Sequence, residues 1–151
     1  DEGSITVYAV FSDMTEEVRR QEILQRQHTN MLQHYREDLQ SGAIITTRSD
    51  ITEDRVLEIR GYTGCRIKNR PNRLRSKMIE KFAAAIPDEK ERAGFLDRFS
   101  NEALIAAHQR DETLTEYDCF ARSPEMSSGR YVHVIEETTT IPGTGNLTGI
   151  L

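Results

Sequence analysis

Two long stretches of β-type sequence in the last third of the chain most constrain its fold. Residues 113–122 (TLTEYDCFAR) and 130–141 (RYVHVIEETTTI) read as strands, and SPEMSSG separates them. The turn PGTGN then leads into a further segment, LTGIL. Consecutive strands with short connections predict antiparallel pairing, and one face of such a sheet has to be covered by another layer.

The middle of the chain supplies that layer, after a hairpin with strands near 43–48 and 55–60. Asp88 with Glu91 predicts the cap of one short helix, and Ser100 predicts the cap of a second that runs to about residue 109. Ahead of them we expect one amphipathic helix between two prolines, because apolar residues recur every four positions, at Leu74, Met78, Phe82 and Ile86.

The first forty residues form a separate pattern. Residues 5–11 (ITVYAVF) alternate like a strand and lead into a helix over 14–40 that has no Gly or Pro, with Asp13 as its N-cap. The helix has few apolar residues, and Gln21 leaves its heptad seam imperfect. That seam consists of Leu24, His28, Met31, Tyr35 and Asp38. We expect self-association along this helix, with a solitary surface helix as the alternative.

Length and composition limit the classes of protein. A chain of 151 residues fits one domain with an appendage, and its hydrophobic fraction of 36% is that of a soluble globular protein. No apolar run approaches the roughly 20 residues that span a bilayer. The net charge of -5 argues against a nucleic-acid binder. Cys65 and Cys119 match no zinc or redox spacing, so we expect reduced thiols in a cytoplasmic protein.

The order of elements over residues 42–151 resembles that of the PAS family of sensor domains. FSDMTEE followed by VRRQEILQRQ is similar to a common PAS ending, in which a strand leads into D-[IM]-T-E and a charged linker helix. SDITEDRVLEIRG, ETLTEYDCF and GRYVHVIEETTTIPGTGNLTGIL resemble a PAS variety repeated in bacterial signalling proteins, often ahead of diguanylate cyclase domains.

The resemblance implies an α+β fold, with a PAS-like antiparallel five-stranded sheet, short helices on one face, and a strand and long linker helix ahead of it. Residues 1–13 would be the terminal strand of a preceding PAS-like unit, 14–41 a linker or coiled-coil helix, and 42–151 a PAS-like domain. The chain would be a non-enzymatic, cytoplasmic sensory or relay module. It would pass conformational change through the linker helix to an output domain outside the chain, such as a diguanylate cyclase or another second-messenger enzyme.

The alternative is a protein-interaction module without a small-molecule ligand. Under that interpretation the basic stretch CRIKNRPNRLRSK, at residues 65–77, or an open sheet edge recruits the partner. The basic stretch also has a simpler interpretation, as a solvated face or as a counterpart to the acidic helices of the same chain.

Eight apolar or amphipathic residues are candidates for lining a ligand pocket, because helical and strand periodicity can bring them to one side. They are Met78, Phe82, Phe99, Leu104, Tyr117, Cys119, Tyr131 and His133. The residues leave open whether this group lines a pocket or fills a core. No cofactor is evident, and an unknown small-molecule ligand stays an alternative. The four histidines lack metal-site spacing, and no catalytic constellation indicates an enzyme.

The 5–11 strand is apolar on both faces, so an unpaired edge would be a liability. The last segment, 147–151, is also short for the final strand of a five-stranded unit. We therefore expect 5–11 to add to a sheet of its own chain or of a dimer mate, near the position of that strand. A homodimer through residues 14–40 and the 5–11 strand follows as the expected assembly.

Overall fold

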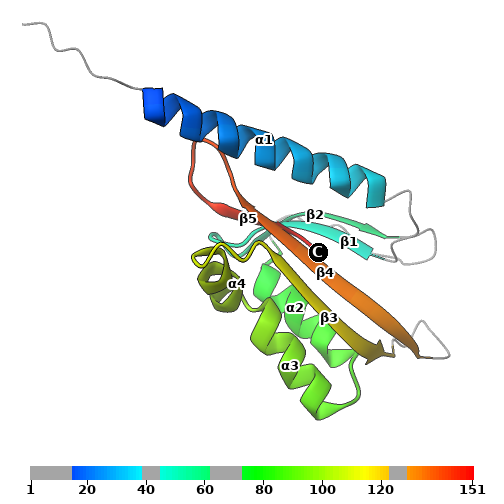
Figure 1. Cartoon of the computed structure of the whole chain (residues 1–151). Helices are drawn as coiled ribbons and strands as arrows, with labels where there is room; N and C mark the ends of the chain where they lie inside the picture. The colour runs from blue at the N-terminus through cyan, green and yellow to red at the C-terminus, as the bar shows by residue number, and fades with distance from the viewer. Residues whose placement is uncertain (1–14, 39–44, 62–72, 123–128) are drawn as a thin grey trace, which may run out of the picture.

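The computed structural model describes residues 15–38, 45–61, 73–122 and 129–151, with side chains left undescribed from 34 to 38. Within these residues the chain forms an α+β fold around one five-stranded antiparallel sheet, in the order β2-β1-β5-β4-β3 (Figure 1). The strands are β1 (Ile45–Asp50), β2 (Arg55–Gly61), β3 (Leu114–Ala121), β4 (Arg130–Thr140) and β5 (Leu147–Ile150). The fold class is confirmed, as are the strands expected near 43–48, 55–60, 113–122 and 130–141.

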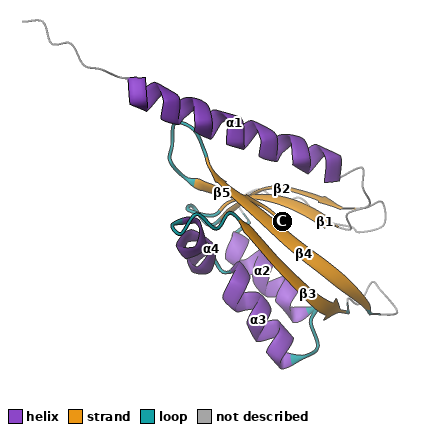
Figure 2. Ribbon diagram, viewed as in Figure 1, coloured by secondary structure: helices purple, strands orange, loops and turns teal. Residues whose placement is uncertain are grey.

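The helices form two separate layers. Figure 2 shows α2 (Arg75–Ala84), α3 (Glu89–Phe99) and α4 (Asn101–His108) on one face of the sheet, and α1 (Thr15–Asp38) on the opposite side. Two predicted caps are confirmed: the Asp88 carboxylate accepts from the Glu91 amide at 2.8 Å, and the Ser100 hydroxyl accepts from the Ala103 amide at 3.2 Å. These caps satisfy backbone donors that a helix start leaves open, so α3 and α4 begin where the sequence places them.

The main core lies between the sheet and the helices α2 and α3. Its best-buried aromatic residue is Phe99, and the Phe95 and Phe99 rings lie 4.8 Å apart between centroids. The buried members of this core are Val56, Ile59, Met78, Ile79, Ala83, Ile86, Phe95, Phe99 and Cys119. A second, smaller cluster joins Leu104 of α4 to Ile51 and Leu147. The predicted amphipathic faces therefore meet the sheet as expected.

Strand register assigns the residues of β3 and β4 to the two faces. Cys119 pairs with Val132 and packs on the helix side, whereas the neighbouring pair Phe120 and Tyr131 points to the other side, which we call the outer face. The outer face near Tyr131 is open, since that side chain is 83% exposed. Ring contact between Phe120 and Tyr131, 5.3 Å between centroids, orders this surface.

Helix α1 crosses the outer face, where it contacts β4 and β5. Met31 is fully buried against Ile150, while Leu24 and His28 are half-buried. Among the α1 side chains that the structure describes, only Met31 is buried. The heptad seam expected to be exposed or to pair with a second helix therefore lies, over its described part, on the chain's own sheet.

Strand β5 fills the centre of the sheet but is short. It pairs with β4 over 137–140 and with β1 over 48–50, and Leu151 adds backbone hydrogen bonds to Thr47 at 2.7 and 3.0 Å. The pairing leaves the 130–136 half of β4 joined to β3. The predicted 5–11 strand lies outside the described residues, and its pairing stays a prediction.

Candidate functional site

A buried ion pair joins the helix layer to the sheet. Arg75, the first residue of α2, donates from Nη2 to Glu136 Oε2 of β4 at 2.6 Å, and both side chains are 1% exposed. Arg75 Nη1 also donates to the Phe99 carbonyl at 2.9 Å and to Asn101 Oδ1 at 2.6 Å. Burial raises the pKa of Glu136, and the charge and hydrogen bond of Arg75 oppose that rise. One guanidinium thus ties three segments of the chain to the sheet.

Further polar contacts lie beside Arg75 and involve Asp54, Ser76 and Asn101. The Asp54 carboxylate accepts from the Ser76 amide and hydroxyl at 2.7 Å each, and from the Asn101 side chain at 2.8 Å. Burial works to raise the pKa of Asp54, but the hydrogen bonds from Ser76 and Asn101 and the charge of Arg75 outweigh it, so the pKa lies below its usual range. Asp54 has a positive φ of 49°, a conformation in which its backbone carbonyl also accepts from the Arg75 amide at 3.1 Å.

The sequence contained a signal for this pair. The buried face of α2 runs through Arg75, Met78, Ile79 and Ala83, so Arg75 occupies a place on the apolar stripe, where a cation needs a partner. Leu74, expected to begin that stripe, is instead the 50% exposed N-cap. The interpretation of the basic stretch as a solvated face fails for Arg75, because its charge is buried against Glu136.

A cleft of about 570 Å³ lies beside this network, between the β1–β2 turn and the starts of α2 and α4. Its walls carry Asp54, Ser76 and Asn101, whose polar groups bond to one another, over an apolar floor that includes Ile79 and Leu96. Arg75 Nε has no hydrogen-bond partner, but it is buried, so it is not accessible from the cleft. The polar side chains of Asp54, Ser76 and Asn101 are therefore hydrogen-bonded to one another and are not presented to a ligand.

The structure separates the eight candidate pocket residues into three places. Met78, Phe99 and Cys119 are buried in the main core, with Phe82 and Tyr117 packed against it. Leu104 lies in the smaller cluster beside Ile51. Tyr131 and His133 lie on the outer face, away from the other six, because their strand positions alternate with those of Val132 and Val134. None of the eight lines the cleft.

Cys119 and His133 differ in their chemistry. Burial, then the charges of Glu91 and Asp118, raise the pKa of the Cys119 thiol, which keeps it protonated and unreactive. His133 Nδ1 lies 2.7 Å from Asp118 Oδ1 on the outer face, and this hydrogen bond raises the pKa of the imidazole. An exposed histidine with a carboxylate neighbour is an ordinary surface pair.

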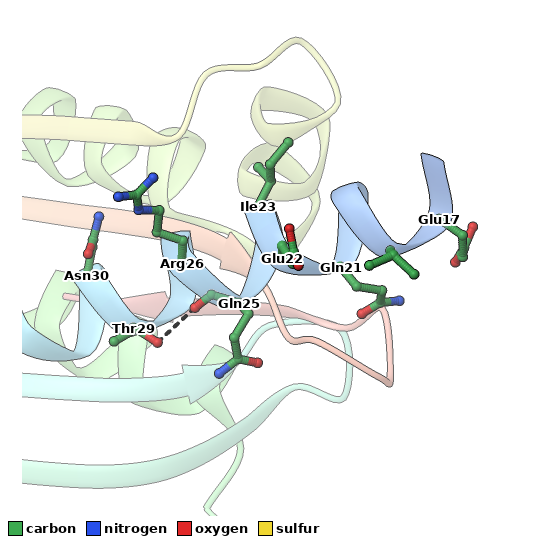
Figure 3. A pocket seen from close by; sticks show the side chains of 9 residues that line it. Glu17, Gln21, Glu22, Ile23, Gln25, Arg26, Thr29 and Asn30 are labelled. Carbon is green, nitrogen blue, oxygen red and sulfur yellow. Dashed lines mark hydrogen bonds between the residues drawn. The ribbon is translucent and has the colours of Figure 1, made fainter. Parts of the chain in front are cut away.

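The described part of α1 carries a hollow along its exposed side. Figure 3 shows that all of the lining side chains come from this one helix, and all are exposed. They are Glu17, Val18, Gln21, Glu22, Ile23, Gln25, Arg26, Thr29 and Asn30. A surface built by a single helix is open and lacks the enclosure of a ligand site. Val18 and Ile23, 51% and 58% exposed, are its apolar members.

The contact between α1 and the sheet brings a titratable side chain close to an apolar one. His28 lies one turn before Met31, and the positive charge of Arg48 on β1 acts on its imidazole. Burial, then that charge, lower the pKa of His28, so the docked helix favours a neutral imidazole. Arg48 is the register partner of Ile150, the residue that Met31 covers. The contact thus combines one apolar anchor with one titratable group.

Comparison with protein-family models, curated proteins and solved structures found no match to this chain. Among the described helices, none is long and apolar enough to cross a membrane. Within the same residues, no group of three His, Cys, Asp or Glu side chains is placed to share a metal ion.

Proposed function

We propose that this chain is a non-enzymatic sensory or relay module of PAS type from a bacterial signal-transduction protein. It dimerises and passes conformational change through α1 to an output domain outside the chain, such as a second-messenger enzyme. The observation that carries the proposal is the shallow docking of α1 on the outer face, with one fully buried side chain, Met31, among those described. A helix held so lightly shifts in response to small changes beneath it.

The sheet connects α1 to the core on the other side. Ile150 contacts Met31 on the outer face, and its neighbour Gly149 faces the helix layer, where a side chain would meet Glu136. Movement of the Arg75–Glu136 pair would therefore shift β5 and, through the contact of Ile150 with Met31, would also shift α1. The order β2-β1-β5-β4-β3, with short helices on one face, supports the PAS-like interpretation.

The relay is tested by perturbing the core and observing α1. A Phe99→Leu variant loosens the core, and a fluorescent label on Gln25→Cys, in a background with Cys65→Ala and Cys119→Ala, reports the position of α1. We expect a changed label environment, and concentration-dependent dimerisation by sedimentation. The control is Lys90→Ala, an exposed change on the outside of α3. An unchanged label together with a monomer at every concentration would remove the proposal.

The alternative of a plain interaction module is favoured by one observation, the open outer face of β3 and β4. Leu114, Tyr131 and Ile135 are 55%, 83% and 44% exposed on that surface. Under this alternative, Tyr131→Ser abolishes partner binding while α1 stays docked and insensitive to changes in the core. Reversing the charges of the basic stretch would test a partner site there, and such a variant has to keep Arg75, because reversing its buried charge would unfold the domain.

A further inference from the structure

Resting on the proposed function, we infer that docking of α1 and its pairing with a second copy of this chain exclude each other. The same helix face serves both contacts, so the sheet acts as an intrachain competitor of dimerisation. A change in the sheet that weakens docking thereby releases a dimerisation helix.

The first step is the identity of the face. The heptad seam passes through Leu24, His28 and Met31, at the 4-3 spacing that a two-stranded coiled coil requires. The structure turns these three residues toward the sheet, whereas the remaining described side chains from Thr15 to Gln27 are exposed. A second helix cannot reach the seam while it lies on the sheet.

The second step is the choice of occupant. The helix Thr15–Asp38 has 24 residues and is about 36 Å long, which accommodates three heptads. Its seam is apolar at Leu24 and Met31, while Glu17, Gln21 and His28 are the polar members of the same 4-3 pattern. A second copy presents the same spacing, and a symmetric pairing buries Met31 against its own equivalent. An identical helix is thus the partner whose spacing the seam matches.

The third step is the balance between the two states. On the sheet, Met31 has Ile150 as its buried apolar partner, and the surrounding surface is polar, with Thr139, Thr148 and Arg48 on the same face. In a coiled coil the imidazole of His28 and the amide of Gln21 interrupt the core, so that contact is also weak. Two weak contacts that share one face make an equilibrium that small perturbations can shift.

Competition predicts that the apparent dimer Kd varies with the inverse square of the fraction of chains whose α1 is undocked. When most chains are docked, the apparent affinity of dimerisation falls with the undocked fraction of each of the two partners. A tenfold rise in the undocked fraction therefore lowers the apparent dimer Kd by about a hundredfold. A dimer that used another surface would show no such coupling.

The decisive experiment fixes α1 on the sheet. Met31→Cys and Ile150→Cys, in a chain with Cys65→Ala and Cys119→Ala, are joined by a short bismaleimide, and the dimer Kd is measured by sedimentation equilibrium. We expect the crosslinked protein to stay monomeric, while the same protein left unlinked dimerises. Crosslinked protein that dimerises as tightly as unlinked protein overturns the inference.

Single substitutions on the two sides of the contact give an independent readout. Ile150→Thr weakens docking from the sheet side and should tighten the dimer, whereas Met31→Gln weakens both contacts and should loosen it. Ile135→Thr, the same change at an exposed position of the outer face, is the matched control and should leave Kd unchanged. Circular dichroism at each concentration confirms that the variants are folded.

The outcomes separate the inference from the proposed function. If Ile150→Thr fails to tighten a dimer that the wild-type chain forms, the competition is wrong but a dimeric relay module stands. If wild-type chain and both variants remain monomers at every concentration, both the inference and the dimeric relay fall.

Discussion

Replacing Arg75 with methionine tests the buried ion pair most directly. The change leaves Glu136, the Phe99 carbonyl and Asn101 Oδ1 without the donor that now lies 2.6, 2.9 and 2.6 Å from them. Removing one partner of a buried pair costs about 3–5 kcal/mol. In a chain of 151 residues each kcal/mol lowers Tm by about 2–4 °C, so we expect Tm to fall by about 6–20 °C.

The loss should depend on pH in a defined direction. Burial raises the pKa of Glu136 and Arg75 opposes that rise, so in Arg75→Met the pKa rises further. The folded variant then keeps a proton that the unfolded carboxyl releases above about pH 4.3. The variant binds more protons folded than unfolded, so its stability falls relative to wild type as pH rises from about 4 to neutrality.

Urea unfolding between pH 4.5 and 7.5 measures both effects. The double variant Arg75→Met/Glu136→Leu also removes the buried carboxyl group that lost its partner, and should return to within about 2 kcal/mol of wild type. Lys77→Met, an exposed cation on the same helix, is the control and should change stability by less than about 0.5 kcal/mol. A loss below about 1 kcal/mol for Arg75→Met, or a double variant whose loss is the sum of its singles, would refute the reasoning.

Three further outcomes are expected. Because the pKa of His28 is lowered in the docked helix, acidification below about pH 6.5 should release α1, which is measured as lower hydrogen-exchange protection factors for the α1 amides. His28→Gln should lose this pH dependence, and equal dependence in both proteins contradicts the prediction. Gly149→Ala places a methyl against Glu136 and should lower the free energy of unfolding by about 1–3 kcal/mol; unchanged urea unfolding would show that the site is roomier than described. Asp88→Ala removes the α3 cap and should cost about 1 kcal/mol in the same assay, with Glu89→Ala as the control; equal losses would mean that the cap bond contributes nothing.

Most of the secondary structure could be predicted from local signals in the sequence. Alternation located β3 and β4, and the caps at Asp88 and Ser100 located α3 and α4, because each signal acts within a few residues. The faces of β4 were not determined locally, since both alternating sets are apolar in part. Tyr131 and His133 were predicted to lie on the same side as the other six candidate pocket residues, yet Val132 and Val134 take that side.

Contacts between residues far apart in the sequence could not be predicted from local signals. The helical periodicity of α2 places Arg75 on its buried stripe. Its partner Glu136 lies 61 residues away, so their ion pair depends on how β4 packs against α2. For the described part of the α1 seam, Leu24, His28 and Met31, the spacing identified the side of the helix that is buried or half-buried. Heptad spacing defines an apolar side without saying what covers it, so the sheet as its neighbour could not be predicted.

The central position of β5 has a consequence for how the domain assembles. The β1–β2 hairpin and the β3–β4 hairpin are neighbours in the sheet only through β5, whose Thr148 hydroxyl bonds the Ser49 carbonyl across 99 residues of chain at 2.7 Å. Closing a loop of that length is slow and is rewarded only after both ends have met. During synthesis on the ribosome the two hairpins therefore cannot share one continuous sheet until residues 147–150 emerge. The rate at which that strand inserts sets when the five-stranded sheet is complete.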